Sequence, residues 1–211
     1  QIGRNFLEVV APVTDGTAAG RYLDRRGGDG GYMVITQGEN RETYDTVRLR
    51  APELGVRVAF ERSRDTSGIC QLHPRDMIAC FCEIEWNEAN DFNGLWHPAG
   101  HSWEDKVRQD VTVDLLGVEI QGDDPEALGD HWAKVIGTPV AVKGDVRTIT
   151  LNNAVLRFVE STDGRGPGLG GLVIAVANRA HILARARVRG CYVNDDRVDI
   201  CGTRFYLTDA D

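Results

Sequence analysis

Residues 113–137, VDLLGVEIQGDDPEALGDHWAKVIG, decide the fold because they join an apolar strand directly to a capped helix. The stretch from Val113 to Gln121 is mostly apolar and predicts a strand. Asp124 then precedes a proline in the first turn of the expected helix, an arrangement typical of helix starts. Apolar residues at helical spacing follow, and Gly137 fits the position just after the last turn.

The order of elements in this stretch recurs along the chain. Short apolar segments near residues 139–142, 148–151 and 154–159 complete the series strand, helix, strand, strand, strand. The same series can be traced over residues 30–86 and 170–207, with Asn40 and Asn178 at the expected N-caps. A matched order of five elements is much rarer by chance than one matched strand. The chain is therefore predicted to be an α+β protein built from tandem βαβββ units.

The segment from Asn5 to Val10, NFLEVV, predicts one more strand. In the repeat it would be the last strand of a further unit, whose earlier elements would lie before Gln1. Either a segment is missing in front of the chain or the fold tolerates a partial first unit, and the pattern favours the former. The predicted organisation is a first domain over residues 1–86 with its N-terminal part absent, a polar linker over 87–112, and a second domain over 113–211.

Composition narrows the classes of function. Hydrophobic residues make up 42% and charged residues 27% of the chain, as in ordinary globular proteins. A net charge of -8 without a long basic run disfavours a nucleic-acid partner. No stretch approaches the ~20 apolar residues that span a bilayer, and no signal sequence opens the chain. Five cysteines, an odd number, suit reduced thiols, so we expect a cytosolic protein with no membrane partner.

Several short motifs carry a resemblance to a known family. They are Phe6–Pro12 (FLEVVAP), Gly20–Gly27 (GRYLDRRG) with Gly30 and Gly31, Gly55–Arg57 (GVR), and Leu72–Asp76 (LHPRD) followed by Glu83. With them the chain resembles the glyoxalase-like, or vicinal oxygen chelate, superfamily, which includes glyoxalase I, extradiol dioxygenases and bleomycin-binding proteins. Its N-terminal half is most similar to methylmalonyl-CoA epimerase-like domains. The resemblance implies that pairs of βαβββ units form cupped mixed sheets around a site.

The resemblance also implies a metal site. In that superfamily a divalent metal is held in the cup by side chains of equivalent strands, and Glu8 and Glu83 fall on two of its carboxylate positions. Met33 or Val34 stands where an imidazole would be expected, and neither can bind a hard metal ion. In the second half Arg157 matches Glu8, so that half is expected to have lost the metal site.

Each candidate residue has a plain structural alternative. Glu8 is either functional or ion-paired, or it faces solvent by simple alternation. Glu83 would share one face of a strand with Phe81 and Glu85, which suggests a polar cup or a wet surface. His73, in a His-Pro turn, would frame the rim of the cup or take part in acid–base chemistry.

Two other features suggest chemistry less strongly. His97 and His101 have a zinc-like spacing, but Pro98 and Gly100 between them break the required helix. The glycine run from Gly164 to Gly171 lacks the Lys-Ser/Thr of a phosphate-binding loop, and a strand rather than a helix follows it. We interpret this run as a flexible hairpin or connection.

Two functions remain open. The first is a glyoxalase-like small-molecule lyase or isomerase with its site in the N-terminal cup, where Glu8, Glu83 and His73 would be catalytic and Glu8 and Glu83 would hold a divalent metal ion. The second is a non-catalytic small-ligand-binding protein, as in the bleomycin-binding relatives. A small-molecule ligand is expected in both cases, and a homodimer is the other partner considered. The discriminating feature is whether the Glu8 and Glu83 carboxylates converge.

Overall fold

Three βαβββ units make up the molecule, as a computed structural model shows for residues 1–89, 99–100 and 102–210. The first unit comprises β1 (Met33–Gln37), α2 (Arg41–Glu53), β2 (Val58–Ser63), β3 (Ser67–Leu72) and β4 (Phe81–Asn87). The second comprises β5 (Thr112–Gly122), α3 (Pro125–Ile136), β6 (Val140–Lys143), β7 (Val146–Thr150) and β8 (Val155–Glu160). The third comprises β9 (Gly168–Val176), α4 (Arg179–Arg189), β10 (Tyr192–Asn194), β11 (Arg197–Ile200) and β12 (Thr203–Asp209). The predicted α+β fold class is confirmed.

The helix starts follow from their capping residues. Asn40, Asp124 and Asn178 each accept a hydrogen bond from the backbone N–H three residues further along. These bonds satisfy one of the free N–H groups that every helix start exposes. At the other end of α3, Gly137 adopts the left-handed conformation, with φ at 77°, that favours glycine. The predicted caps are thus confirmed.

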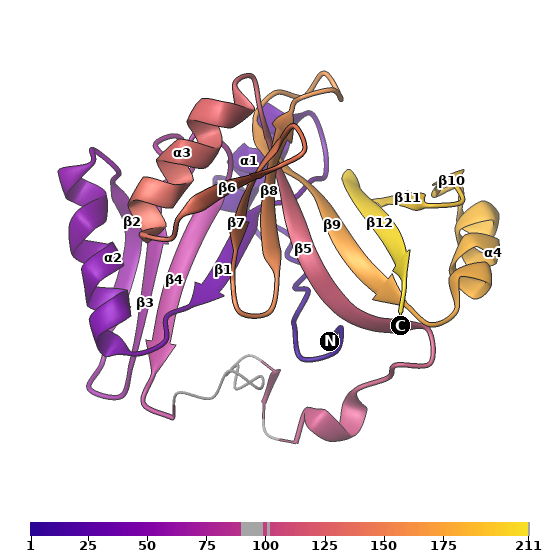
Figure 1. The fold of residues 1–211 in the computed structure, drawn as a ribbon, viewed down its shortest axis with the longest axis horizontal. Helices are drawn as coiled ribbons and strands as arrows, with labels where there is room; N and C mark the ends of the chain where they lie inside the picture. The colour runs from indigo at the N-terminus through magenta and orange to yellow at the C-terminus, as the bar shows by residue number, and fades with distance from the viewer. Residues whose placement is uncertain (90–98, 101, 211) are drawn as a thin grey trace.

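The units are arranged in two sheets (Figure 1). The second and third units form one eight-stranded sheet of order β10-β11-β12-β9-β5-β8-β7-β6, because their first strands, β5 and β9, pair antiparallel. Each of these first strands has the last strand of its own unit on its other side, in parallel. The first unit forms a separate four-stranded sheet of order β1-β4-β3-β2. We call the eight-stranded sheet with its inner face the C-terminal cup.

One continuous core joins the two sheets on the side of the helices. Trp132 of α3 is fully buried against Phe158 of β8, and its indole N–H donates a 2.9 Å hydrogen bond to the Met77 carbonyl. Helices α2 and α3 lie side by side (Figure 1). The first unit and the C-terminal cup therefore share their hydrophobic core. In the described part of the chain, no helix is both long and apolar enough to cross a membrane.

The predicted strand from Asn5 to Val10 is wrong. In this region the structure has only an isolated bridge between Ile2 and Asn5, followed by an extended segment. Val9 and Val10 are 83% and 52% exposed, so burial in a sheet does not favour a strand here. The segment is instead tied down by Asn5, whose amide donates to Asp114 at 2.8 Å. It therefore cannot be counted as the last strand of a further unit.

Two more findings concern local structure. The helix α1 (Ala18–Arg26) was not predicted, although Thr17 caps its start and Gly27, with φ at 66°, ends it. Its short sequence is flanked by glycines, which concealed the helical pattern. Within the unit predicted over residues 170–207, the last two strands form the hairpin β11–β12, because Cys201 and Gly202 both adopt positive φ and turn the chain.

Candidate functional site

The first candidate site lies on the face of the four-stranded sheet opposite α2, which we call the open face. Side chains of β4 alternate: Cys82, Ile84 and Trp86 are buried on the helix side, and Phe81, Glu83 and Glu85 point the other way. In register, Glu83 lies between Ile35 of β1 and Gln71 of β3. The period-two alternation expected from the sequence therefore describes this strand.

Glu83 is held at the middle of the open face. It is only 5% exposed, and it accepts a 2.6 Å hydrogen bond from the side-chain amide of Gln71. Burial raises the pKa of Glu83, the Gln71 hydrogen bond lowers it, and the Glu8 carboxylate raises it further. The structure therefore brings Glu8 and Glu83 close enough to interact electrostatically.

Glu8 reaches this region from the extended N-terminal segment, and its side chain is exposed. Further along the same segment, Val10 and Pro12 border a small hollow of about 40 Å³ together with Tyr22 and Tyr32. Tyr32 also packs on Phe81, with ring centres 5.0 Å apart. The segment thus lies along the side of the open face, and Glu8 belongs to an extended segment rather than to a strand.

Glu85 is a second acid on the open face; the sequence placed it on the same strand face as Glu83, but it was not among the expected site residues. Burial, with a further contribution from Glu83, raises the pKa of Glu85 to about 7. Near it in register, the Gln37 side-chain nitrogen is buried without a hydrogen-bond partner among the described residues, as is the Asn87 side-chain oxygen. The two-residue spacing from Glu83 was the signal that could have identified Glu85.

His73 lies in the turn after β3. Its Nδ1 accepts a 3.2 Å hydrogen bond from the Arg75 N–H, and its ring centre is 6.4 Å from that of Phe81. Burial, followed by the Arg57 guanidinium, lowers the pKa of His73. Its contacts are thus with the turn and with Phe81 at the rim of the open face. The pair His97 and His101 lies outside the described residues.

A metal ion is poorly matched to the open face. Within residues 1–89, 99–100 and 102–210, no group of three or more His, Cys, Asp and Glu side chains could hold one. The Gln71 amide presents its N–H, not its oxygen, to Glu83, and Ile35 occupies the neighbouring position on β1. Glu8 and Glu83 as metal ligands therefore remain a prediction, and no chemical step is derived from a metal here.

The C-terminal cup has a different centre, made of charged side chains. Glu119 of β5 is 5% exposed, and its Oε1 accepts a 2.9 Å hydrogen bond from the Tyr206 hydroxyl. The Arg204 guanidinium lies 3.0 Å from the same oxygen, and Arg157 lies 3.4 Å from Oε2. In register, Arg157, Glu119, Gly171 and Arg204 stand side by side on the four central strands β8, β5, β9 and β12.

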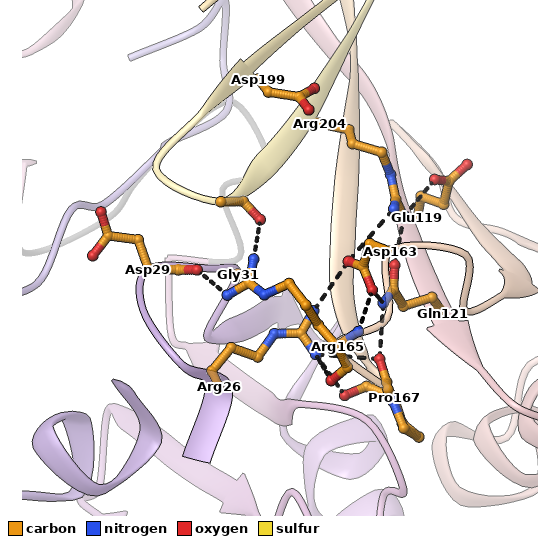
Figure 2. A network of polar contacts seen from close by, with 12 residues as sticks. Arg26, Asp29, Gly31, Glu119, Gln121, Asp163, Arg165, Pro167, Asp199 and Arg204 are labelled. Carbon is orange, nitrogen blue, oxygen red and sulfur yellow. Dashed lines mark hydrogen bonds and ion pairs between the residues drawn. The ribbon is translucent and has the colours of Figure 1, made fainter. Parts of the chain in front are cut away.

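The network continues from this centre to the N-terminal helix (Figure 2). Arg204 donates a 2.7 Å hydrogen bond to the Gln121 side chain, whose amide donates to Asp163 at 2.8 Å. Arg26 of α1 lies 3.7 Å from the Asp163 carboxylate and also donates to the backbone carbonyls of residues 165–167. In return, Arg165 donates to the Asp29 and Gly202 carbonyls. Arg26 thus ties α1 to the loop before β9, and Arg165 ties the same loop to the segment after α1 and to the β11–β12 turn.

The glycine run makes this arrangement possible. A Cβ on Gly170 would collide with the Arg204 guanidinium, and one on Gly168 would lie 2.7 Å from Nη1 of Arg26. Both glycines belong to the buried strand β9, so the interpretation of the whole run as a flexible connection is wrong for this part. Gly164 and Gly166 alone, with φ at 69°, form the turn before the strand.

Comparison with known proteins bears on the fold. No family model matches the sequence, and no curated protein matches it either. Among solved structures, the Mn(II)-bound glyoxalase from Novosphingobium aromaticivorans is similar, with a TM-score of 0.56, 12% identity, and coverage of 84% of this chain and 62% of that one. Homoprotocatechuate 2,3-dioxygenase from Arthrobacter globiformis gives a TM-score of 0.56 at 12% identity, covering 85% of this chain and 61% of that one. A hypothetical protein from Staphylococcus aureus gives 0.57 at 10% identity, covering 92% and 71%.

These similarities establish the class of fold. The arrangement of βαβββ units is that of glyoxalases and extradiol dioxygenases, as the resemblance in the sequence implied. The chain spans less than two thirds of the length of these two named enzymes. Because one fold carries many reactions, identity at this level establishes the fold alone.

Proposed function

We propose that the protein binds a small molecule on the open face of its first sheet and exchanges a proton with it through Glu85, with Glu83 beside it. The observation that carries the proposal is the pKa of Glu85, raised to about 7 by burial and by Glu83. A carboxyl group with a pKa near neutrality can both give and accept a proton at working pH. This matches the proton transfers of an isomerase or lyase.

Hydrogen-bonding groups around Glu85 support a polar ligand. The buried Gln37 nitrogen and Asn87 oxygen have no partner among the described residues, and an unpaired buried polar group is costly. Ile35 and Phe60, 38% and 48% exposed, lie on the same sheet and offer apolar contact. A small neutral molecule with hydroxyl or amide groups would satisfy both kinds of surface.

The second candidate function is binding without catalysis, and it has its own support. Two adjacent carboxyl groups without a positioned metal give a polar surface that can hold a ligand but need not act on it. In this reading Glu8 and Glu83 orient the ligand by hydrogen bonds and His73 has only its turn role.

We also place the protein in the cytosol, in keeping with five free cysteines.

The test begins with ligand binding. Saturation-transfer NMR with small hydroxylated and amide fragments is expected to find binders to the wild type that Glu85→Gln weakens at least tenfold. Glu88→Gln, an exposed acid just beyond the same strand, serves as the control and should leave binding unchanged. Equal binding to the wild type, Glu85→Gln and Glu88→Gln would contradict the proposed site.

Catalysis is separated from binding by isotope exchange. In D₂O, an isomerase or lyase site should introduce deuterium into a bound fragment that carries an acidic C–H, and Glu85→Gln should abolish this. Binding with no exchange would instead favour the non-catalytic function. Elemental analysis of wild type and Glu83→Ala checks the predicted metal: one divalent ion per chain, lost in the variant, would replace the metal-free proposal with a metal-dependent one.

A further inference from the structure

The centre of the C-terminal cup is an oxygen-lined site that already contains a cation. The Arg204 guanidinium lies 2.7 Å from the Gln121 side-chain oxygen and 3.0 Å from Glu119 Oε1. Asp163 Oδ2 lies 3.7 Å from it on a third side. Three oxygen atoms from β5 and from the loop before β9 therefore face one positive group (Figure 2).

The Arg204 guanidinium lies where the second and third units meet at the centre of the eight-stranded sheet. Arg204 extends from β12 and meets Glu119 of β5, so it bridges the third and second units at the sheet centre. In the superfamily that the sequence resembles, a divalent metal is held in the cup by side chains of equivalent strands, and Arg157 in place of a carboxylate led us to expect that this half has lost it. Here those strands supply one carboxylate, from Glu119, and two guanidinium groups, from Arg157 and Arg204. This set of side chains does not fit a divalent metal ion.

Because the charged groups at the centre of the C-terminal cup are buried, they disfavour the entry of a second cation. The side chains of Arg204 and Glu119 are 9% and 6% exposed, so the charges interact with little screening by solvent. Arg157 and Arg26 lie at the two outer ends of the same network, facing Glu119 and Asp163. A second cation entering the centre would be repelled by three guanidinium groups. The absence of a Cβ at Gly170 leaves room for the guanidinium that is already there.

We infer that the Arg204 guanidinium is the built-in cation of the C-terminal cup, occupying the place that a divalent metal would need and excluding one from it. The cup then serves to lock α1 and the loop before β9 to the central strands. This inference concerns a different sheet from the proposed ligand site, so each can fail without the other.

The first experiment is a Mn²⁺ titration followed by electron paramagnetic resonance, on wild type, Glu119→Gln and Glu83→Gln. We expect Glu119→Gln to bind as much Mn²⁺ as the wild type. Mn²⁺ binding that is lost in Glu119→Gln and kept in Glu83→Gln would overturn the inference, because it would place a metal at the centre of the cup. Loss in Glu83→Gln alone would leave the inference standing and would bear only on the open face.

The second experiment removes the cation and returns it. Arg204→Ala should lower the melting temperature by roughly 10 °C, since it removes the guanidinium that lies against the buried Glu119 carboxylate and the Gln121 oxygen. Methylguanidinium, well below denaturing concentrations, should raise the melting temperature of Arg204→Ala, whereas methylammonium at the same concentration should not. Arg189→Ala, an exposed arginine of α4, is the control and should show no rescue. Rescue by both cations alike, or in both variants alike, would contradict a guanidinium-shaped site.

A third variant covers the case in which Arg204→Ala does not fold. The double variant Glu119→Gln/Arg204→Met removes both charges and fills the space with an apolar side chain. It should melt closer to the wild type than Glu119→Gln alone, because no buried charge is left unpaired. If the double variant loses as much stability as the two single substitutions lose together, the two side chains act independently.

Discussion

The side-chain amide of Gln71 on β3 donates a 2.6 Å hydrogen bond to the Glu83 carboxylate on β4, directly across the strand pair. This bond is the main favourable contact that the structure gives to a carboxylate of which only 5% is exposed. Burial raises the pKa of Glu83, and the hydrogen bond from the Gln71 amide opposes this by stabilising the ionised carboxylate.

Gln71→Leu is therefore expected to raise the pKa of Glu83 and to destabilise the protein at neutral pH by about 1–3 kcal/mol. Carbon-13 NMR of the glutamate carboxyl groups measures the pKa, and denaturant unfolding measures the stability. Gln109→Leu, which removes an exposed amide, is the control and should change neither. An unchanged Glu83 titration in Gln71→Leu would show that the hydrogen bond does not control this acid.

Glu85 should give the stability of the protein a pH dependence. Its pKa is about 7 in the folded protein against an ordinary value of 4.5, so the folded state binds more protons between these two values. Stability contributed by the neutral form is therefore lost as the pH rises from about 4.5 to about 7. Above pH 7, Glu85→Gln should be more stable than the wild type by on the order of 2 kcal/mol. Urea unfolding at a series of pH values tests this. Glu88→Gln is the control, and its free energy of unfolding should change with pH as that of the wild type does.

Gly170→Ala probes the space that β9 leaves for arginine. A Cβ at this position would overlap the Arg204 guanidinium, so we expect a loss of about 1–3 kcal/mol as the side chain is displaced. Gly38→Ala is the matched control, because a Cβ there meets its nearest atom at 3.3 Å. Thermal unfolding of the two variants should differ clearly; equal stability would mean that Arg204 can move aside at no cost.

Arg26→Lys tests the contact between α1 and the loop before β9. The guanidinium Nη1 donates to three successive carbonyls, at 2.9, 3.2 and 3.0 Å, and a lysine ammonium cannot also reach Asp163 with the same geometry. Amide hydrogen exchange in residues 163–168 should become faster, while exchange in α4 should stay as it was. Unchanged protection of the loop would show that Arg26 is not what holds it.

Much of the fold could be predicted because its signals are local. Asn40, Asp124 and Asn178 each cap a helix within three residues of themselves, and the order of elements repeats along the chain. The same method failed for Asn5 to Val10, where an apolar sequence has no neighbouring strand to pair with among the described residues. Apolar composition predicts a strand, but only a partner can satisfy its backbone.

The charged centre of the C-terminal cup could not be predicted in this way. Glu119 meets Tyr206 across 87 residues of sequence, and Arg26 meets the Arg165 carbonyl across 139. Such contacts depend on strand register, which periodicity does not specify. On the open face the spacing of Glu83 and Glu85 was visible in the sequence, but the burial that raises the pKa of Glu85 was not.

The hydrogen bonds of Arg26 and Arg165 around the loop before β9 bear on how the molecule unfolds. Arg26 holds this loop to α1, and Arg165 holds it to the segment after α1 and to the β11–β12 turn, so the loop cannot detach without breaking hydrogen bonds of both guanidinium groups. The hydrogen bond from the Trp132 indole to the Met77 carbonyl adds a buried link between the first unit and the second. Calorimetry should accordingly record one heat-absorption peak whose calorimetric and van't Hoff enthalpies agree, rather than two separate transitions.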